Sequence, residues 1–187
     1  MTTQKAPLER VLAKLRSRQV LKHIEHKSVL DYGCGKNAWT SQYLQKKCSH
    51  IVGYEPSIEK DFKAGSVQIY HSLEALKEQS IKFDAVIALA VFEHIKPMKL
   101  RDCLRELLEL TNENGIVVGT IPRPESRSLL EFLSLRINLI DKSQILDHKV
   151  YYDDLWLQEI TENTGWDLNH YKKFQLGMNG IFILAKH

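Results

Sequence analysis

Two acidic residues accompany a glycine turn and define the best candidate ligand site in the sequence. In VLDYGCGKNAW (29–39), Asp31 comes two residues before Gly33, and Gly35 follows. Glycines allow the backbone to turn with positive φ and to approach a ligand closely. Glu55 ends the next apolar run, where a carboxylate can accept hydrogen bonds from both hydroxyls of a ribose. The spacing predicts a nucleoside cofactor over the turn.

The charge of Asp31 indicates which nucleoside cofactor fits. The stretch GCGKNA (33–38) satisfies the dinucleotide pattern G-x-G-x-x-[GA], so an NAD(P)-dependent oxidoreductase is an alternative. In such a site a pyrophosphate lies over this turn, where the Asp31 carboxylate would repel it. S-adenosylmethionine carries an ammonium and a sulfonium and no phosphate, so an acid attracts it. We therefore favour S-adenosylmethionine as the cofactor.

Strands and helices that alternate along the chain would position these residues. Apolar runs predict strands at 28–32, 50–55, 66–70, 83–90 and 115–122, and the segments between them show helical spacing. This alternation predicts an α/β fold with a doubly wound, Rossmann-like, mostly parallel sheet and helices on both faces. Two extended runs, 166–176 and 180–187, lie close together and predict a C-terminal antiparallel hairpin.

Length and composition limit the classes of protein to consider. The 187 residues suit a single domain, with an N-terminal helix within 1–25 and a substrate-side insertion at 122–150. Leu8, Val11 and Leu15 lie on one face of that helix, which we expect to pack on its own domain. A net charge of +3 and the lack of a basic stripe argue against nucleic acid as a partner.

The sequence also bears on the compartment of the protein. The three cysteines are scattered, with no metal-ligand spacing, and no apolar run reaches the ~20 residues of a membrane span. The N-terminus is too charged for a signal peptide. We expect a cytoplasmic monomer or homodimer without a metal site.

Four ordered motifs in this chain resemble those of class I S-adenosylmethionine-dependent methyltransferases of the small-molecule type. The motifs are VLDYGCGKNAWT, GYEPS, FDAVIALAVFEHI and NENGIVVGTIP. Asn37 replaces the third glycine of the usual first motif. The resemblance implies a seven-stranded sheet in which only the last strand is antiparallel.

The resemblance also implies roles for individual residues. Asp31, Gly33 and Gly35 would cradle the amino-acid part of the cofactor, Glu55 would hold the ribose, and Leu89 and Ala90 would flank the methionine or adenosine. Leu73, at the end of the third predicted strand, is a further candidate, against the adenine. Cys34 lies within the cofactor turn, where nearby acids are expected to raise its pKa and make it inert.

A hydroxyl acceptor needs a general base, because a neutral oxygen is a poor nucleophile. His94 and His148 are the candidates, since histidine titrates near neutral pH. His94 follows the fourth predicted strand, and His148 follows the insertion. The C-terminal part resembles small methyltransferases associated with sugar modification, which favours a sugar or sugar-nucleotide hydroxyl as the small-molecule acceptor. A non-catalytic cofactor-binding scaffold is the other alternative.

Overall fold

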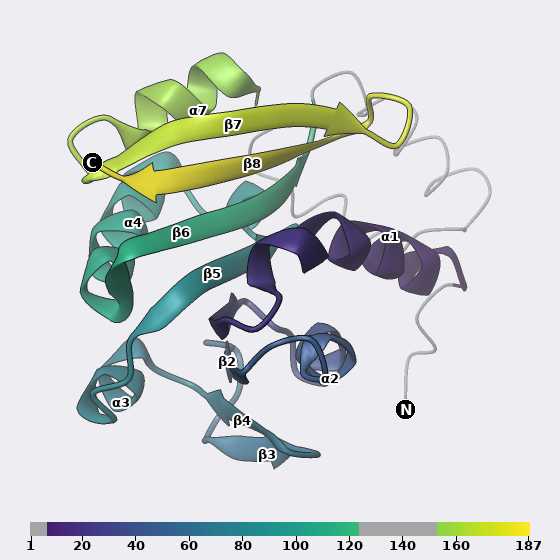
Figure 1. Ribbon diagram of the computed structural model, residues 1–187, viewed down its shortest axis with the longest axis vertical. Coiled ribbons are helices and arrows are strands. Elements are labelled where there is room, and N and C mark those ends of the chain that lie inside the picture. The colour runs from purple at the N-terminus through teal and green to yellow at the C-terminus, as the bar shows by residue number, and fades with distance from the viewer. Residues whose placement is uncertain (1–6, 124–152) are drawn as a thin grey trace.

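An eight-stranded sheet forms the centre of the computed structural model, which describes residues 7–123 and 153–187 (Figure 1). The strand order is β3-β4-β2-β1-β5-β6-β8-β7. The strands are β1 (Ser28–Tyr32), β2 (His50–Tyr54), β3 (Phe62–Ala64), β4 (Val67–Tyr70), β5 (Phe83–Leu89), β6 (Thr111–Pro122), β7 (Trp166–Phe174) and β8 (Asn179–Lys186). Strands β4, β2, β1, β5 and β6 run parallel.

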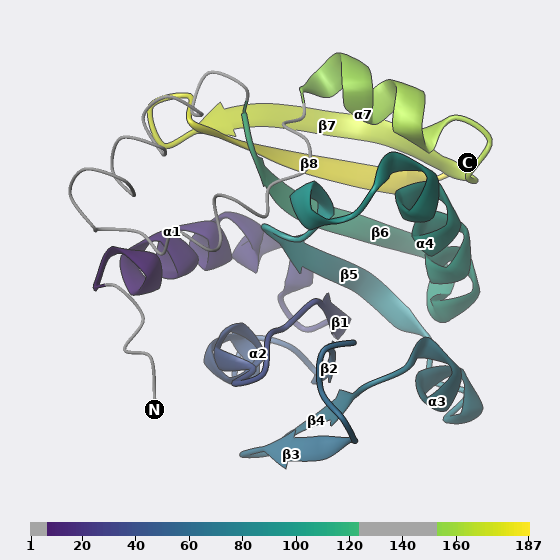
Figure 2. The same ribbon diagram turned by 180° about the vertical axis from the view of Figure 1, so that it is seen from behind.

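Helices cover both faces of the sheet, as the two opposite views show (Figures 1 and 2). The helices α1 (Pro7–Ile24) and α2 (Trp39–Leu44) lie on one face, and α3 (Leu73–Glu78), α4 (Pro97–Leu110) and α7 (Asp154–Thr161) lie on the other. Alternate residues of β5 feed the two cores: Ala85 and Ile87 pack on the α1 side, and Val86 and Ala88 on the α4 side. The apolar run predicted to be a doubly covered strand is therefore confirmed.

The carboxyl ends of β1 and β5 meet where the strand order reverses. From β1 the chain first builds the β2 and β4 side of the sheet and then crosses to β5 on the other side of β1. Open α/β sheets bind ligands in the crevice at such a switch point. The glycine turn after β1 therefore lies at the edge where a ligand is expected.

The predicted fold class is confirmed, but the sheet has eight strands rather than the seven expected. The additional strand is β3, which pairs antiparallel with β4, so the antiparallel strands are not confined to the chain end. Its three residues gave too short an apolar run to show in the sequence. The C-terminal hairpin is present: β8 pairs antiparallel with both β6 and β7.

The predicted N-terminal helix agrees only partly with the structure, and most of the predicted insertion lies outside the described residues. Helix α1 packs on its own domain through buried Val20 and Ile24, whereas Val11, placed on the buried face from the sequence, is 53% exposed. Most of the predicted 122–150 insertion, including His148, lies outside the described residues. None of the described helices has the length and apolar character that crossing a bilayer requires.

Candidate functional site

The glycine turn leaves part of its backbone open toward the carboxyl edge of the sheet. Gly33 and Gly35 both adopt left-handed φ values, +73° and +74°. A Cβ on Gly33 would lie 2.8 Å from the Val91 side chain, so no larger residue fits there. A Cβ on Gly35 would meet nothing within 4 Å. The first glycine therefore serves close packing, and the second leaves open space above the backbone.

Asp31 is the penultimate residue of β1, next to this turn, and is almost fully buried. Its exposed fraction is 2%, and its Oδ2 accepts a hydrogen bond of 2.6 Å from the Ser41 hydroxyl on α2. Burial, which has the largest influence, and the charge of Glu55 together raise the pKa of Asp31 to about 7, although the hydrogen bond from Ser41 lowers it. A carboxyl group in this environment gains from a nearby cation, because the cation stabilises its charged form.

Glu55 follows β2 and holds the turn in place. Its Oε2 accepts the Gly35 N–H at 2.8 Å, and its Oε1 accepts the Ser57 N–H at 3.0 Å. An ionised carboxylate has about four acceptor positions, so each oxygen can accept one more hydrogen bond. Glu55 is thus able to support the turn and to accept a hydroxyl donor as well.

The end of β5 closes the other side of the switch point. Leu89 is partly buried on the α1 side, and Ala90 has a left-handed φ of 59°. The Ala90 N–H donates to the carbonyl of Thr120 on β6 at 2.9 Å, which anchors this bend. Val91 then packs over Gly33. A non-glycine residue in this conformation is costly, and such strain concentrates at functional sites.

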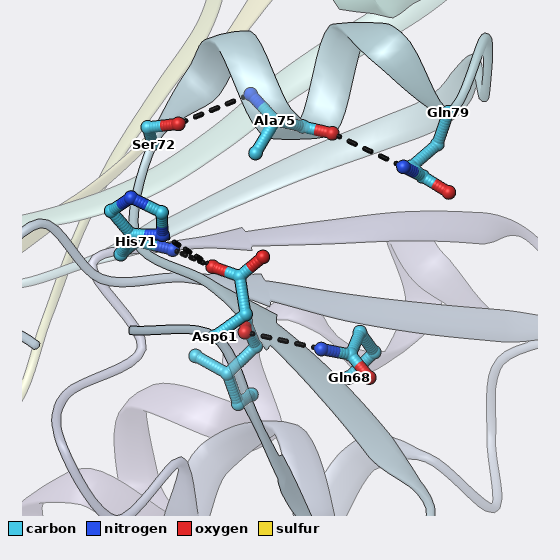
Figure 3. A network of polar contacts seen from close by, with 7 residues as sticks. Asp61, Gln68, His71, Ser72, Ala75 and Gln79 are labelled. Carbon is cyan, nitrogen blue, oxygen red and sulfur yellow. Dashed lines mark hydrogen bonds and ion pairs between the residues drawn. The ribbon is translucent and has the colours of Figure 1, made fainter. Parts of the chain in front are cut away.

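The residues after β4 are held by an Asp–His pair that sequence reasoning missed (Figure 3). Asp61 Oδ1 accepts the His71 backbone N–H at 2.8 Å and lies 2.5 Å from His71 Nδ1. Burial acts to raise the pKa of Asp61, but these contacts with His71 hold that pKa below its usual value. Ser72 then caps α3, accepting the Ala75 N–H. Leu73, the predicted adenine contact, is buried in the α4-side core with 4% exposed.

The Cys34 thiol in the turn has the environment expected of an inert group. Burial raises its pKa well above the usual range, and the charges of Asp31 and Glu55 raise it further. The sulfur lies against Gly53, where a Cβ would approach it to 2.7 Å. Cys34 therefore packs the turn against β2.

His94 lies in the short 3-10 helix η1 (Phe92–His94), directly after the bend at Ala90. This helix brings the half-buried His94 to the carboxyl edge of β5, where the sequence placed a base. Among residues 7–123 and 153–187, no group of three His, Cys, Asp or Glu side chains could hold a metal ion.

The comparison with protein families decides between the alternatives of the sequence analysis. A family model described as a methyltransferase domain matches residues 5–171, which is most of the chain. The chain belongs to the methyltransferase-domain family. The predicted class I S-adenosylmethionine-dependent methyltransferase is thereby confirmed, and a search of curated proteins found no significant match.

Solved structures similar to this methyltransferase share its fold at low identity. An S-adenosylmethionine-dependent methyltransferase from Archaeoglobus fulgidus has a TM-score of 0.62 and 18% identity, covering 95% of this chain and 94% of that one. The 1,6-didemethyltoxoflavin-N1-methyltransferase of Burkholderia thailandensis, solved with 1,6-didemethyltoxoflavin and S-adenosylhomocysteine, has a TM-score of 0.65 and 11% identity, covering 94% and 78%. The N-methyltransferase NodS of Bradyrhizobium japonicum has a TM-score of 0.60 and 11% identity, covering 96% and 97%.

The structure adds residues to this candidate site that the sequence analysis did not select. Ser41 lies ten positions from Asp31 in sequence, and the short α2 brings them together. Glu93 is 1% exposed, although its neighbour His94 was chosen as the candidate base. The motif VFEHI contains both residues, but periodicity does not tell which of two adjacent polar residues becomes buried.

Proposed function

We propose that this methyltransferase binds S-adenosylmethionine at the carboxyl edge of β1, β2 and β5 and transfers its methyl group to a small molecule. The observation that carries the proposal is the pair of buried carboxyl groups, Asp31 and Glu55, beside the open backbone of Gly35. The charge of Glu55 disfavours ionisation of Asp31, and a cationic ligand relieves this repulsion. A pyrophosphate at the same place would increase it.

The cofactor would be held by the residues that the sequence selected. Asp31, Gly33 and Gly35 would receive its amino-acid part, and Glu55 would accept ribose hydroxyls with its remaining acceptor positions. Leu89 and Ala90 would flank the methionine or adenosine. The site would then contribute mainly alignment of sulfur, methyl and acceptor, which is worth roughly 7–11 kcal/mol in well-oriented reactions.

A hydroxyl of a sugar or sugar nucleotide is the acceptor that we propose, on the loose resemblance of the C-terminal part to sugar-modifying methyltransferases. Such an acceptor is neutral at the reacting atom, which suits an edge that already contains two acids.

Calorimetric titration tests the cofactor assignment. S-adenosylmethionine and S-adenosylhomocysteine should bind, and NAD should not. Asp31→Asn and Glu55→Ala should each weaken binding by ~1–3 kcal/mol, about fivefold to 150-fold, because each removes a charged hydrogen-bond partner. Glu74→Gln, on the exposed surface of α3, is the matched control. Binding of NAD alone, or unchanged affinity in both variants, would refute the proposed site.

A further inference from the structure

Two buried polar atoms at the carboxyl edge lack a hydrogen-bond partner. Within the described part of the chain, Glu93 Oε2 and Thr120 Oγ1 are both shielded from solvent and make no hydrogen bond. The exposed fractions of the two residues are 1% and 0%. Leaving such a group unpaired destabilises the folded protein, because it loses its hydrogen bonds to water. Native proteins contain few unpaired polar groups, and each calls for an explanation.

The two residues approach the same side of the same edge. Thr120 is the cross-strand partner of Leu89 and alternates with Val118, which packs on the α1 side, so its side chain faces that side. Its carbonyl accepts the Ala90 N–H, so it lies beside the bend that leads into η1.

Glu93 turns away from the core that holds its neighbour. Phe92 packs on the α4 side, with its ring centroid 5.3 Å from that of Phe182. The described charge that acts on Glu93 is Arg16, from α1 on the opposite face of the sheet. Glu93 is therefore near enough to α1 to feel the charge of Arg16, whereas Phe92 packs on the α4 side. Burial raises the pKa of Glu93 to about 7, although a hydrogen bond from its own backbone N–H and the charge of Arg16 oppose this.

We propose that Glu93 and Thr120 form the polar end of the acceptor site, bind the hydroxyl that is methylated, and that Glu93 takes its proton. This inference rests on the proposed methyl transfer. The acceptor oxygen forms the new O–C bond, the C–S bond breaks with its electron pair going to sulfur, and the hydroxyl proton moves to Glu93 Oε2. S-adenosylmethionine becomes S-adenosylhomocysteine, and Glu93 later returns the proton to water. Thr120 Oγ1 completes the site as a second hydrogen-bond partner for the acceptor.

The proposed class of acceptor follows from the chemistry of these two groups. A carboxylate accepts a hydrogen bond and a hydroxyl can donate or accept one, so together they suit a neutral O–H. A phosphate or carboxylate at the same position would lie against Glu93. The reacting group is therefore a neutral hydroxyl, whatever charge the rest of the acceptor carries.

The first experiment follows methyl transfer from methyl-labelled S-adenosylmethionine to methyl glucosides and UDP-sugars. Glu93→Gln should lower kcat at least a hundredfold at pH 8 and change the affinity for S-adenosylmethionine less than twofold. His94→Gln should lower kcat less than tenfold, and Glu74→Gln should behave as the unmodified protein. Thr120→Val should raise the KM for the acceptor at least fivefold. The inference would be overturned if Glu93→Gln retained its turnover, or if His94→Gln lost more kcat than Glu93→Gln.

The second experiment measures thermal stability and does not depend on the identity of the acceptor. If the two groups are unpaired because they serve a ligand, Glu93→Gln should raise Tm at pH 8, with a smaller rise at pH 5, and Thr120→Val should raise Tm at both. Thr161→Val, which removes a buried hydroxyl bonded to the Leu157 carbonyl at 3.0 Å, should lower Tm. A lower Tm in both Glu93→Gln and Thr120→Val would mean that the groups are structural and would overturn the inference.

The two experiments separate failure of this inference from failure of the proposed function. If S-adenosylmethionine does not bind, the proposed function fails. If it binds and neither class of sugar is methylated, the proposal of a sugar acceptor fails. The Tm results alone then decide whether Glu93 and Thr120 are unpaired because they bind a ligand.

Discussion

The two ends of the parallel strands satisfy their polar groups in different ways. At the amino end, the carboxylate of Asp84 accepts the Ser28 N–H at 2.9 Å and the Asn112 side-chain amide at 2.7 Å. Lys186 donates to the carbonyl of Thr111 at 2.7 Å, near the start of β6. These contacts join β1, β5, β6 and β8, so the polar groups at this end stabilise the sheet.

The carboxyl end contains polar groups in costly environments. Asp31 is buried with a raised pKa, and Glu93 and Thr120 have buried atoms without partners. Locally unfavourable features of this kind are expected where function requires them, and the rest of the fold must compensate. The comparison teaches that the polar groups of the same strands are paired at one end and left in costly environments at the other, where we propose that the ligand binds.

The largest effect that we expect on stability concerns the packing of the turn at the carboxyl end. Gly33→Ala should lower the free energy of unfolding by about 2–4 kcal/mol, combining left-handed strain with overlap of the new Cβ and Val91. Gly35→Ala has the same φ but open space, so it should cost only ~1 kcal/mol. Urea denaturation measures both variants.

A double-mutant cycle isolates the overlap. Val91→Ala should recover most of the loss in Gly33→Ala, with a coupling free energy of roughly 1–3 kcal/mol. Equal losses in Gly33→Ala and Gly35→Ala would show that strain alone requires the glycines and that Val91 does not define the turn.

Two aspartates at opposite ends of the sheet offer the most direct comparison. Asp84→Ala should lower the free energy of unfolding by about 1–2 kcal/mol, because two donors lose their acceptor, and should leave the affinity for S-adenosylmethionine unchanged. Asp31→Asn should do the reverse: it should weaken the binding of S-adenosylmethionine and preserve the free energy of unfolding at pH 8. Chemical denaturation and calorimetry on both variants measure the four quantities. A loss of affinity in Asp84→Ala would contradict the separation of roles.

The general fold and the glycine turn of the candidate site were predictable from the sequence for a physical reason. Buried parallel strands are continuous apolar runs, and a turn with open backbone needs glycine, so both leave local signals, as in β5 and at Gly35. The short β3 and the Asp61–His71 pair depend on contacts between segments far apart in the chain or on very few residues. The burial of Glu93 depends on which way η1 turns, which periodicity does not encode.

The pH dependence of cofactor binding should be the next largest effect. S-adenosylmethionine is cationic and should favour ionised Asp31, so affinity should rise about tenfold between pH 6 and 8 as the carboxyl group, with its pKa about 7, loses its proton. The stability of the unliganded protein should change in the opposite direction and fall as the pH rises. Since the folded pKa lies above the usual aspartate pKa of 3.8, the stability contributed by protonated Asp31 is full at low pH and is lost as pH rises through about 7.

Asp31→Asn is the control for both trends, because it removes this titration and leaves those of the cofactor itself. Calorimetric titrations and thermal unfolding at pH 5, 6, 7 and 8 supply the data. Parallel pH profiles of affinity in Asp31→Asn and the unmodified protein would show that Asp31 does not face the cation.

The smallest expected effect distinguishes a residue that tunes the site from one that only supports a helix. Ser41→Ala removes the hydroxyl that donates to Asp31 at 2.6 Å, and this hydrogen bond lowers the pKa of Asp31. The pKa of Asp31 should therefore rise above about 7, which leaves less of the carboxyl group ionised at neutral pH. The affinity for S-adenosylmethionine should then fall by about threefold at pH 7. The affinity should recover at pH 9, where Asp31 is ionised in both proteins. Ser17→Ala is the matched control, since its buried hydroxyl donates only to the Ala13 carbonyl of α1 at 2.8 Å. An affinity loss in Ser41→Ala that persists at pH 9 would mean that Ser41 shapes the pocket instead of tuning the charge of Asp31.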